Sequence, residues 1–219
     1  MRVTVLGAGI IGLSVADELL RRGHHVTVVD PAPGTGASYA AAGMLCPSAE
    51  LWHGEEQLLR LGQESLALWP DYADRLGVPL RADGTLLVGY DAGDRQRVAR
   101  QADLLARHGA AVEQLADGTA LLADEASVDP RSVVAALLDR VPVAPINSPG
   151  PCDVTVLATG AVLPPPYDAL VRGVRGEILR VRSDDPPPCT IRGWVYGDPV
   201  YLVPRAAGEV VVGATSEEH

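Results

Sequence analysis

The amino-acid sequence predicts an α/β fold in which a parallel sheet is layered with a mixed, largely antiparallel sheet. The N-terminal part indicates the parallel layer, because it runs strand, glycine-rich turn, helix, strand, and both strands are almost wholly apolar. The C-terminal part alternates short apolar runs with turns such as "AAGE", which is typical of antiparallel strands. A chain of 219 residues can form one large domain or two modest ones around a sizeable core.

The first elements form a βαβ unit. Strands are predicted at Val3–Leu6 and His25–Asp30, and a helix is predicted between them at Ile10–Arg22. Pro31–Gly36 is a loop. The stretch Gly36–Leu45 ("GASYAAAGML") follows it without a charge and consists mostly of alanine and glycine. An alanine-rich helix or turn of such small side chains lets the backbone approach something flat and bulky.

The rest of the chain continues with helices and strands. Helices are predicted at Glu55–Trp69, Asp94–His108 and Arg131–Arg140, and Pro70 is expected to stop the first of them. A proline-rich connector is predicted at 141–151, and the acids of Asp124–Asp129 are read as a surface turn. The further predicted strands are Gly84–Tyr90, Asp153–Thr159, Gly176–Arg182, Trp194–Tyr196, Val200–Pro204 and Glu209–Ala214.

Two discontinuous domains are expected from this order of elements. A nucleotide-binding domain would take residues 1–75 and 120–165. A substrate-binding domain would take residues 76–119 and 166–219.

Composition restricts the possible functions. The formal charge is −10, which argues against a nucleic-acid partner or an anionic membrane surface. All basic residues are arginine, so neither a lysine Schiff base nor a P-loop lysine is possible. The three cysteines have no metal-binding spacing, so no metal is expected and the thiols should be reduced. No membrane-spanning run or signal peptide is recognisable, and we expect a cytoplasmic protein.

The turn after the first strand carries a dinucleotide-binding pattern, Gly7-x-Gly9-x-x-Gly12. Gly7 permits a tight turn, Gly9 lets a pyrophosphate approach the backbone, and Gly12 lets helix and strand pack closely. The helix that follows presents free N–H groups and a positive dipole end to the anion. Asp30 ends the next strand, where a carboxylate accepts hydrogen bonds from a ribose diol and disfavours NADP. The alternative is a glycine-rich turn with a surface aspartate.

The stretch Gly36–Leu45 distinguishes FAD from NAD, because a plain NAD domain continues into a polar surface helix at this point. The stretch resembles a flavin-wrapping segment of the D-amino-acid oxidase family, in particular of the glycine oxidases of thiamine biosynthesis. "VDPRSVVAALL", "DVTVLATGA", "RGEILRV" and "YLVPRAAGEVVVGAT" resemble other segments of that family in order and spacing. A buried alanine-rich packing helix is the alternative for Gly36–Leu45 alone.

The resemblance implies which residues contact FAD. They are Gly7, Gly9, Ile10, Ile11, Gly12, Asp30, Pro31, Ala37, Ser38, Ala42, Gly43, Met44, Thr159 and Gly160. The adenine contact near Val143 is left open.

The resemblance also implies a substrate side. Tyr201 falls where a tyrosine hydroxyl holds the substrate carboxylate, and Ser216 falls where a pocket-wall residue lies. Tyr201 could instead be an ordinary strand tyrosine. Family members continue beyond the position of His219 with an arginine that clamps the carboxylate, and the sequence lacks this C-terminal part. Arg175 and Arg205 are the arginines in the substrate sheet that could substitute.

The resemblance implies an FAD-dependent oxidase that converts a small amine or amino acid to an imine and releases hydrogen peroxide. Its partners would be that substrate and oxygen, and a homo-oligomer is left open. A flavin- or nucleotide-binding module without catalysis is one alternative. An NAD-dependent oxidoreductase is another.

Overall fold

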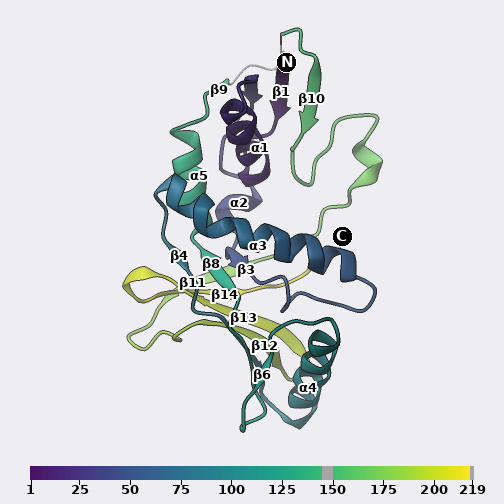
Figure 1. Ribbon diagram of the computed structural model, residues 1–219, viewed down its shortest axis with the longest axis vertical. Helices are drawn as coiled ribbons and strands as arrows, with labels where there is room; N and C mark the ends of the chain where they lie inside the picture. Colours follow the sequence, from purple (N-terminus) through teal and green to yellow (C-terminus); the bar gives the residue numbers. More distant parts are fainter. Residues whose placement is uncertain (145–149, 218–219) are drawn as a thin grey trace.

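A computed structural model describes residues 1–144 and 150–217 (Figure 1). The described chain contains a four-stranded, a seven-stranded and a three-stranded sheet. The four-stranded sheet and the seven-stranded sheet lie at opposite ends of the molecule, and the long helix α3 (Glu56–Leu76) crosses between them (Figure 1).

The four-stranded sheet is the parallel layer. Its order is β10-β1-β2-β9, and each of its strand pairs is parallel. The strands are β1 (Arg2–Leu6), β2 (His25–Val29), β9 (Val143–Ala144) and β10 (Val154–Leu157), and α1 (Ile10–Arg21) connects β1 to β2. The predicted βαβ unit is therefore confirmed.

The prediction that residues 141–151 form a connector throughout is wrong. Val143 and Ala144 form the edge strand β9, which pairs with Val28 and Val29 of β2. Two consecutive apolar residues beside a proline are too short a pattern to indicate a strand. This strand forms because the neighbouring strand β2 supplies its hydrogen-bond partners. Residues 145–149 of this stretch lie outside the described residues.

The seven-stranded sheet is mixed. Its order is β11-β14-β13-β12-β5-β7-β6. The pair of β12 and β5 is parallel, and all other strand pairs of this sheet are antiparallel. The strands are β5 (Thr85–Gly89), β6 (Glu113–Gln114), β7 (Ala120–Leu122), β11 (Ile178–Arg182), β12 (Thr190–Val195), β13 (Asp198–Pro204) and β14 (Glu209–Gly213). The predicted combination of a parallel sheet with a largely antiparallel one is confirmed.

The third sheet joins distant parts of the sequence. Its antiparallel strands are β3 (Met44–Leu45), β8 (Ala126–Val128) and β4 (Leu80–Arg81), in the order β3-β8-β4. The remaining elements are α2 (Ala37–Ala40), α4 (Ala92–Arg107), α5 (Pro130–Leu138) and the short 3-10 turns η1 (Asp168–Leu170) and η2 (Ala206–Gly208).

The prediction that Pro70 stops the helix at Glu55–Trp69 is wrong, because α3 continues to Leu76. Proline inside a helix removes one hydrogen bond and costs about 3 kcal/mol. The turns after Pro70 offset this loss by packing: Tyr72 and Leu76 contact the core under the parallel sheet, and the rings of Trp69 and Tyr72 meet edge to face at 5.2 Å. The helix ends at Gly77, which adopts the left-handed conformation at φ 69°.

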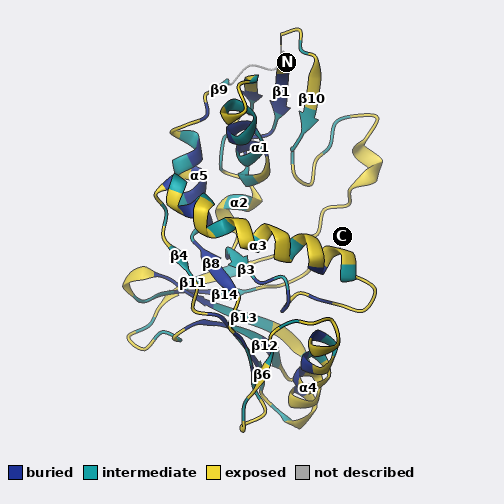
Figure 2. Cartoon of the chain, in the orientation of Figure 1, coloured by how far each residue is buried: buried dark blue, intermediate teal, exposed yellow. Residues whose placement is uncertain are grey.

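Two large apolar cores hold the layers together. One lies between the parallel sheet and helices α1 and α5, and it includes the fully buried side chains of Val5, Leu13 and Leu137. The other lies between the seven-stranded sheet and α4, around Leu87 and Leu105. Figure 2 shows buried residues in α1, α5 and β8, and exposed residues along much of α3. None of the helices in the described chain is long and apolar enough to cross a membrane.

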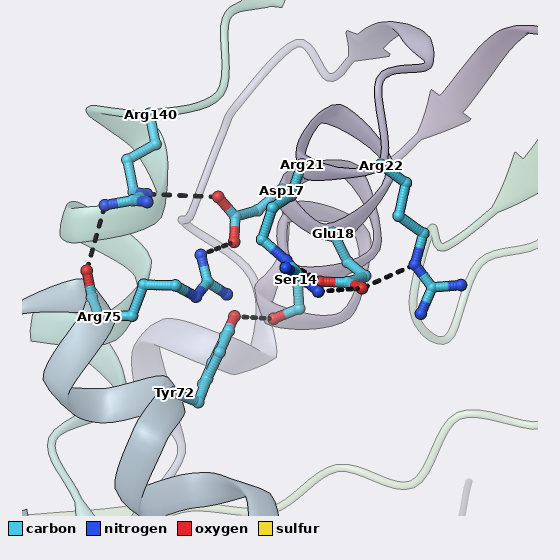
Figure 3. Close-up of polar contacts among 8 residues, drawn as sticks. All are labelled: Ser14, Asp17, Glu18, Arg21, Arg22, Tyr72, Arg75 and Arg140. Atoms are coloured by element: carbon cyan, nitrogen blue, oxygen red, sulfur yellow. Dashed lines mark hydrogen bonds and ion pairs between the residues drawn. The ribbon is translucent and has the colours of Figure 1, made fainter.

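A buried carboxylate ties α1 to α3 and to the turn that follows α5 (Figure 3). Asp17 is 6% exposed, and its carboxylate oxygens lie 2.6 Å from Arg75 Nη1 and 3.3 Å from Arg140 Nε. The Tyr72 hydroxyl donates to Ser14 Oγ of α1 at 2.8 Å, one turn before Asp17. These contacts fix α3 against the helix that follows the glycine-rich turn.

Candidate functional site

The glycine-rich turn is shaped by close backbone contacts at its first and last glycines. Gly7 has φ +104°, and a Cβ on it would lie 2.2 Å from the carbonyl oxygen of Ala158. A Cβ on Gly12 would lie 2.0 Å from the carbonyl oxygen of Gly7. Both distances are too short for any side chain, so these two positions require glycine for the fold itself.

Gly9 differs from its neighbours. It has φ −81°, and the nearest atom to a Cβ there is Ser38 Oγ at 3.1 Å. The space in front of Gly9 is therefore free of backbone. Ile10, the first residue of α1, donates its N–H to Ser38 Oγ at 3.0 Å. The remaining N–H groups of the first helical turn have no intrahelical acceptor and can donate to an anion.

Asp30 stands where the sequence predicts it, directly after β2. Its Oδ2 accepts a hydrogen bond from the Ala8 N–H at 2.6 Å, and its Oδ1 accepts one from the Ala32 N–H at 2.8 Å. The carboxylate is thereby fixed beside the glycine-rich turn. Each oxygen keeps a second lone pair for a further donor such as a ribose hydroxyl. Pro31, the next residue, is exposed.

The bend after β10 lies against the first glycine. Ala158 donates its N–H to the Leu6 carbonyl at 2.8 Å, and Thr159 N lies 3.0 Å from the position of a Cβ on Gly7. Thr159 Oγ1 is buried and has no hydrogen-bond partner in the described chain. Gly160 has φ +68° with open space in front of it. The structure thus brings together the two glycine-containing bends that the sequence predicts as binding segments.

The stretch Gly36–Leu45 has less helix than its composition indicates. Helix α2 covers only Ala37–Ala40, contains no buried residue, and is followed by a turn at Gly43 with φ +72° and by β3. The Gly43 carbonyl accepts a hydrogen bond from the Val128 N–H at 2.9 Å. The stretch therefore begins beside the first residue of α1, where Ser38 accepts from Ile10, and ends in the three-stranded sheet.

Tyr201 lies on the face of the seven-stranded sheet that meets this stretch. It is on β13, opposite Arg192 of β12 and Gly213 of β14. Its ring packs with Met44 against a small buried cluster that contains Ala42. Partial burial raises the pKa of the Tyr201 hydroxyl, so it is a hydrogen-bond donor at neutral pH. Ala42 and Met44, predicted on the cofactor side, and Tyr201, predicted on the substrate side, are in one cluster.

Other predicted substrate-side residues are placed differently. Ser216 is exposed in the segment after β14. Arg205 is 8% exposed and donates from Nη2 to the Ala42 carbonyl, so it faces the alanine-rich stretch. Arg175 pairs with the neighbouring Glu177 at the surface. Neither arginine lies beside Tyr201 in the strand register.

The arginine that does lie beside Tyr201 is Arg192, which the sequence analysis missed. Arg192 and Tyr201 are cross-strand partners, so their side chains share one face of the sheet. The Arg192 guanidinium forms a two-point ion pair with Glu50, with Nη2 and Oε2 2.9 Å apart. The predicted strand begins only at Trp194, so no sequence pattern indicated that Arg192 lies on this face.

The reading of Asp124–Asp129 as a surface turn is wrong for Glu125. This residue is 2% exposed, and β8 directly after it is buried throughout. Its Oε1 accepts a hydrogen bond from the Ala49 N–H at 2.8 Å. Burial raises the pKa of the Glu125 carboxyl, although the Ala49 hydrogen bond partly opposes this shift.

We expect Glu125→Gln to raise stability more at neutral than at acidic pH. Between the ordinary pKa of a glutamate and the raised native value, the native protein binds more protons than the unfolded chain, so stability falls as pH rises. Glutamine keeps an acceptor for Ala49 and removes this slope. Urea unfolding midpoints at several pH values test it, with Asp124→Asn at the exposed neighbour as control. Parallel pH profiles for wild type and Glu125→Gln would contradict the prediction.

Comparisons with known proteins agree with this geometry. A family model described as "DAO: FAD dependent oxidoreductase" matches residues 2–142. The putative thiamine biosynthesis oxidoreductase ThiO of Rhizobium etli is 34% identical over 251 residues, covering 100% of this chain and 72% of that protein. The bifunctional protein ThiO/ThiG of Trichormus variabilis is 26% identical over 263 residues, covering 99% of this chain and 40% of that protein.

Solved structures show the same fold. Glycine oxidase from Geobacillus kaustophilus superposes with a TM-score of 0.82 at 22% identity, covering 99% of this chain and 72% of that one. Iminodiacetate oxidase from Chelativorans sp. BNC1 superposes with a TM-score of 0.76 at 21% identity, covering 99% of this chain and 72% of that one.

Proposed function

Because the chain belongs to the family of FAD-dependent oxidoreductases that the DAO model describes, we propose that it oxidises a small amine or amino acid of glycine size to an imine. The nearby relatives named for thiamine biosynthesis and glycine oxidase support this class of substrate. The proposal also divides the chain as the sequence suggests, with FAD held by residues 1–75 and 120–165 and substrate by residues 76–119 and 166–219.

The residues at the candidate site fit FAD. No backbone atom lies within 4 Å of a Cβ on Gly9, so a pyrophosphate can approach beside the first turn of α1. The buried Thr159 hydroxyl lacks a partner within the described chain, and FAD can supply one. The Ile11 side chain is 68% exposed at the start of α1, where a bound cofactor can cover it. Asp30 is held in place to accept from a ribose.

The chain's own residues bind and orient in this mechanism. When bound, FAD would supply the hydride acceptor for oxidation at the substrate α-carbon, and oxygen would serve as the final oxidant with release of hydrogen peroxide. The Tyr201 hydroxyl donates a hydrogen bond to the substrate carboxylate and fixes the position of the α-carbon. Arg192 lies next to Tyr201 on the same face, but Glu50 compensates its charge, so Tyr201 makes the carboxylate contact in this mechanism. No side-chain base is required, because the substrate reacts as its neutral amine.

One observation carries the proposal: Tyr201 packs in the same cluster as Ala42 and Met44. A substrate held by the Tyr201 hydroxyl is thereby placed next to the stretch that resembles the flavin-wrapping segment. No such neighbourhood is needed for a nucleotide-binding module without catalysis.

The proposal is tested by reconstituting the purified protein with FAD and recording its visible spectrum. Peroxide production is then measured with glycine, sarcosine and D-alanine. We expect retained flavin absorbance after gel filtration and peroxide with at least one substrate. Flavin absorbance without turnover would favour the non-catalytic module, and a colourless protein would contradict the proposal as a whole.

Tyr201→Phe is expected to raise KM for the amino acid about tenfold to a hundredfold and to leave the flavin spectrum unchanged. A hydrogen bond to a charged group contributes about 1.5–3 kcal/mol, and each 1.4 kcal/mol is about a factor of ten. Steady-state peroxide assays measure the change. Tyr90→Phe is the matched control, because Tyr90 is 61% exposed and packs on Tyr196. Equal KM values for wild type and Tyr201→Phe would remove Tyr201 from substrate binding.

A further inference from the structure

A cavity of about 260 Å³ lies between α4, β12 and the segment that connects β3 to α3. Its walls include Leu51 and Trp52 from that segment, Arg97, Arg100 and Leu104 from α4, and Trp194 from β12. We call it the indole cavity. None of these residues belongs to the set predicted to contact FAD or substrate.

The walls of the cavity are unusually rich in tryptophan. The chain has three tryptophans, and two of them, Trp52 and Trp194, line the cavity. Trp52 is 61% exposed, whereas Leu51 beside it is 4% exposed and anchors the segment in the core. Indole rings stack favourably on other flat rings and gain free energy when water is removed from them. The open face of Trp52 therefore fits a planar apolar group.

The polar side of the cavity is cationic. Arg97 and Arg100 are three residues apart on α4, so their side chains share one helix face. Arg97 Nη1 donates to the carbonyl of Gly197 at 3.0 Å, which orients the guanidinium without neutralising it. Within residues 1–144 and 150–217, neither Arg97 nor Arg100 forms an ion pair with a carboxylate. Two uncompensated cations here stand out in a chain of formal charge −10.

We propose that the indole cavity binds a small aromatic carboxylic acid, with its ring against Trp52 and Trp194 and its carboxylate on the guanidinium groups of Arg97 and Arg100. Arginine suits a carboxylate because its planar fork matches both oxygens. The volume is below the roughly 300–1,000 Å³ of sites for drug-sized ligands, so the ligand is one ring with a short acidic arm. This site is independent of the proposed oxidase activity.

The cavity nevertheless lies close to the substrate face. Trp194 is two residues from Arg192 on β12, so both side chains are on the face that carries Tyr201. Arg192 forms its ion pair with Glu50, and Glu50 directly precedes Leu51 of the cavity wall. A ligand in the cavity would therefore contact the chain next to this ion pair.

The test uses tryptophan fluorescence of the full chain with phenylacetate as the probe. An exposed indole emits at longer wavelength than a covered one, so binding should give a saturable blue shift. Phenylacetamide, which has the ring without the charge, and acetate, which has the charge without the ring, should each bind at least tenfold more weakly. Isothermal titration calorimetry measures the same affinities without relying on an indole.

Variants locate the site. Arg100→Gln should weaken phenylacetate binding at least tenfold, whereas Arg107→Gln in the last turn of the same helix should leave the affinity unchanged. Trp69→Phe should keep the blue shift, because Trp69 packs on Tyr72 away from the cavity, and Trp52→Phe should lose most of it. Equal affinities for phenylacetate and phenylacetamide, or equal affinities in Arg100→Gln and Arg107→Gln, would overturn the proposal. Absence of both heat and spectral change would also overturn it.

Discussion

Gly9→Ala is expected to leave the fold intact and to weaken FAD binding at least tenfold. A Cβ at this position meets only Ser38 Oγ at 3.1 Å, and the backbone at φ −81° suits alanine. The methyl group would instead occupy the space through which a pyrophosphate approaches the helix N-terminus. Losing one hydrogen bond to a charged group corresponds to about 1.5–3 kcal/mol. FAD titration by fluorescence quenching measures the affinity, and urea unfolding without cofactor measures the fold.

Gly12→Ala is the matched comparison within the same turn. Its Cβ would lie 2.0 Å from the Gly7 carbonyl oxygen and 3.3 Å from the Ala158 side chain, so strand and helix must move apart. We expect this variant to lose stability even without FAD, by about 1–3 kcal/mol as in other overpacked sites. If Gly9→Ala and Gly12→Ala lost stability equally, or if Gly9→Ala bound FAD like wild type, the assignment of Gly9 to the cofactor would be wrong.

The local patterns of the sequence predicted the βαβ unit well. The βαβ unit depends on contacts between residues close in sequence, so its hydrophobic periodicity and glycine spacing are sufficient. Asp30 could be placed because it directly follows a strand, and the structure holds it against the Ala8 N–H of the glycine-rich turn. Thr159 could be placed for a similar reason, because it follows β10, the edge strand that pairs with β1.

Contacts between distant residues account for what the sequence did not reveal. Glu125 is buried because residues 46–49 fold over it, and a string of acids gives no sign of that cover. The Arg192–Glu50 pair joins positions 142 residues apart, and no local pattern specifies such a pair. The continuation of α3 beyond Pro70 likewise depends on the core that receives Leu76. In each case tertiary packing decides against the local preference.

The alanine-rich stretch shows how packing and chemistry combine. Its first part, α2, contains no buried residue, so the small side chains there do not fill a core. Its last part is held by Arg205 through the Ala42 carbonyl and by Val128 through the Gly43 carbonyl. The stretch is thus fixed at its end and open at its start, beside the glycine-rich turn. This arrangement suits a backbone that must approach a flat ligand.

Asp17→Asn is expected to lower the free energy of unfolding by about 2 kcal/mol. Removing one partner of a buried ion pair typically costs about 3–5 kcal/mol, because the other charge is left unpaired. The loss should be smaller here, since the side chains of Arg75 and Arg140 are 28% and 42% exposed and remain partly hydrated. Asparagine keeps the size of Asp17, so the measurement isolates the charge. Urea unfolding followed by circular dichroism gives the value.

Glu18→Gln on the same helix provides the control. Hydrogen bonds from Arg21 and Arg22 lower the pKa of Glu18 to about 2. Its ion-pair distances of 2.8 and 2.7 Å are similar to those of Asp17 (Figure 3). Both arginines are exposed, however, and water screens exposed pairs. We therefore expect a much smaller change for Glu18→Gln than for Asp17→Asn. Equal changes would show that the contact of Asp17 with Arg75 and Arg140 contributes no more than a surface ion pair. Apolar packing alone would then hold α3 against α1.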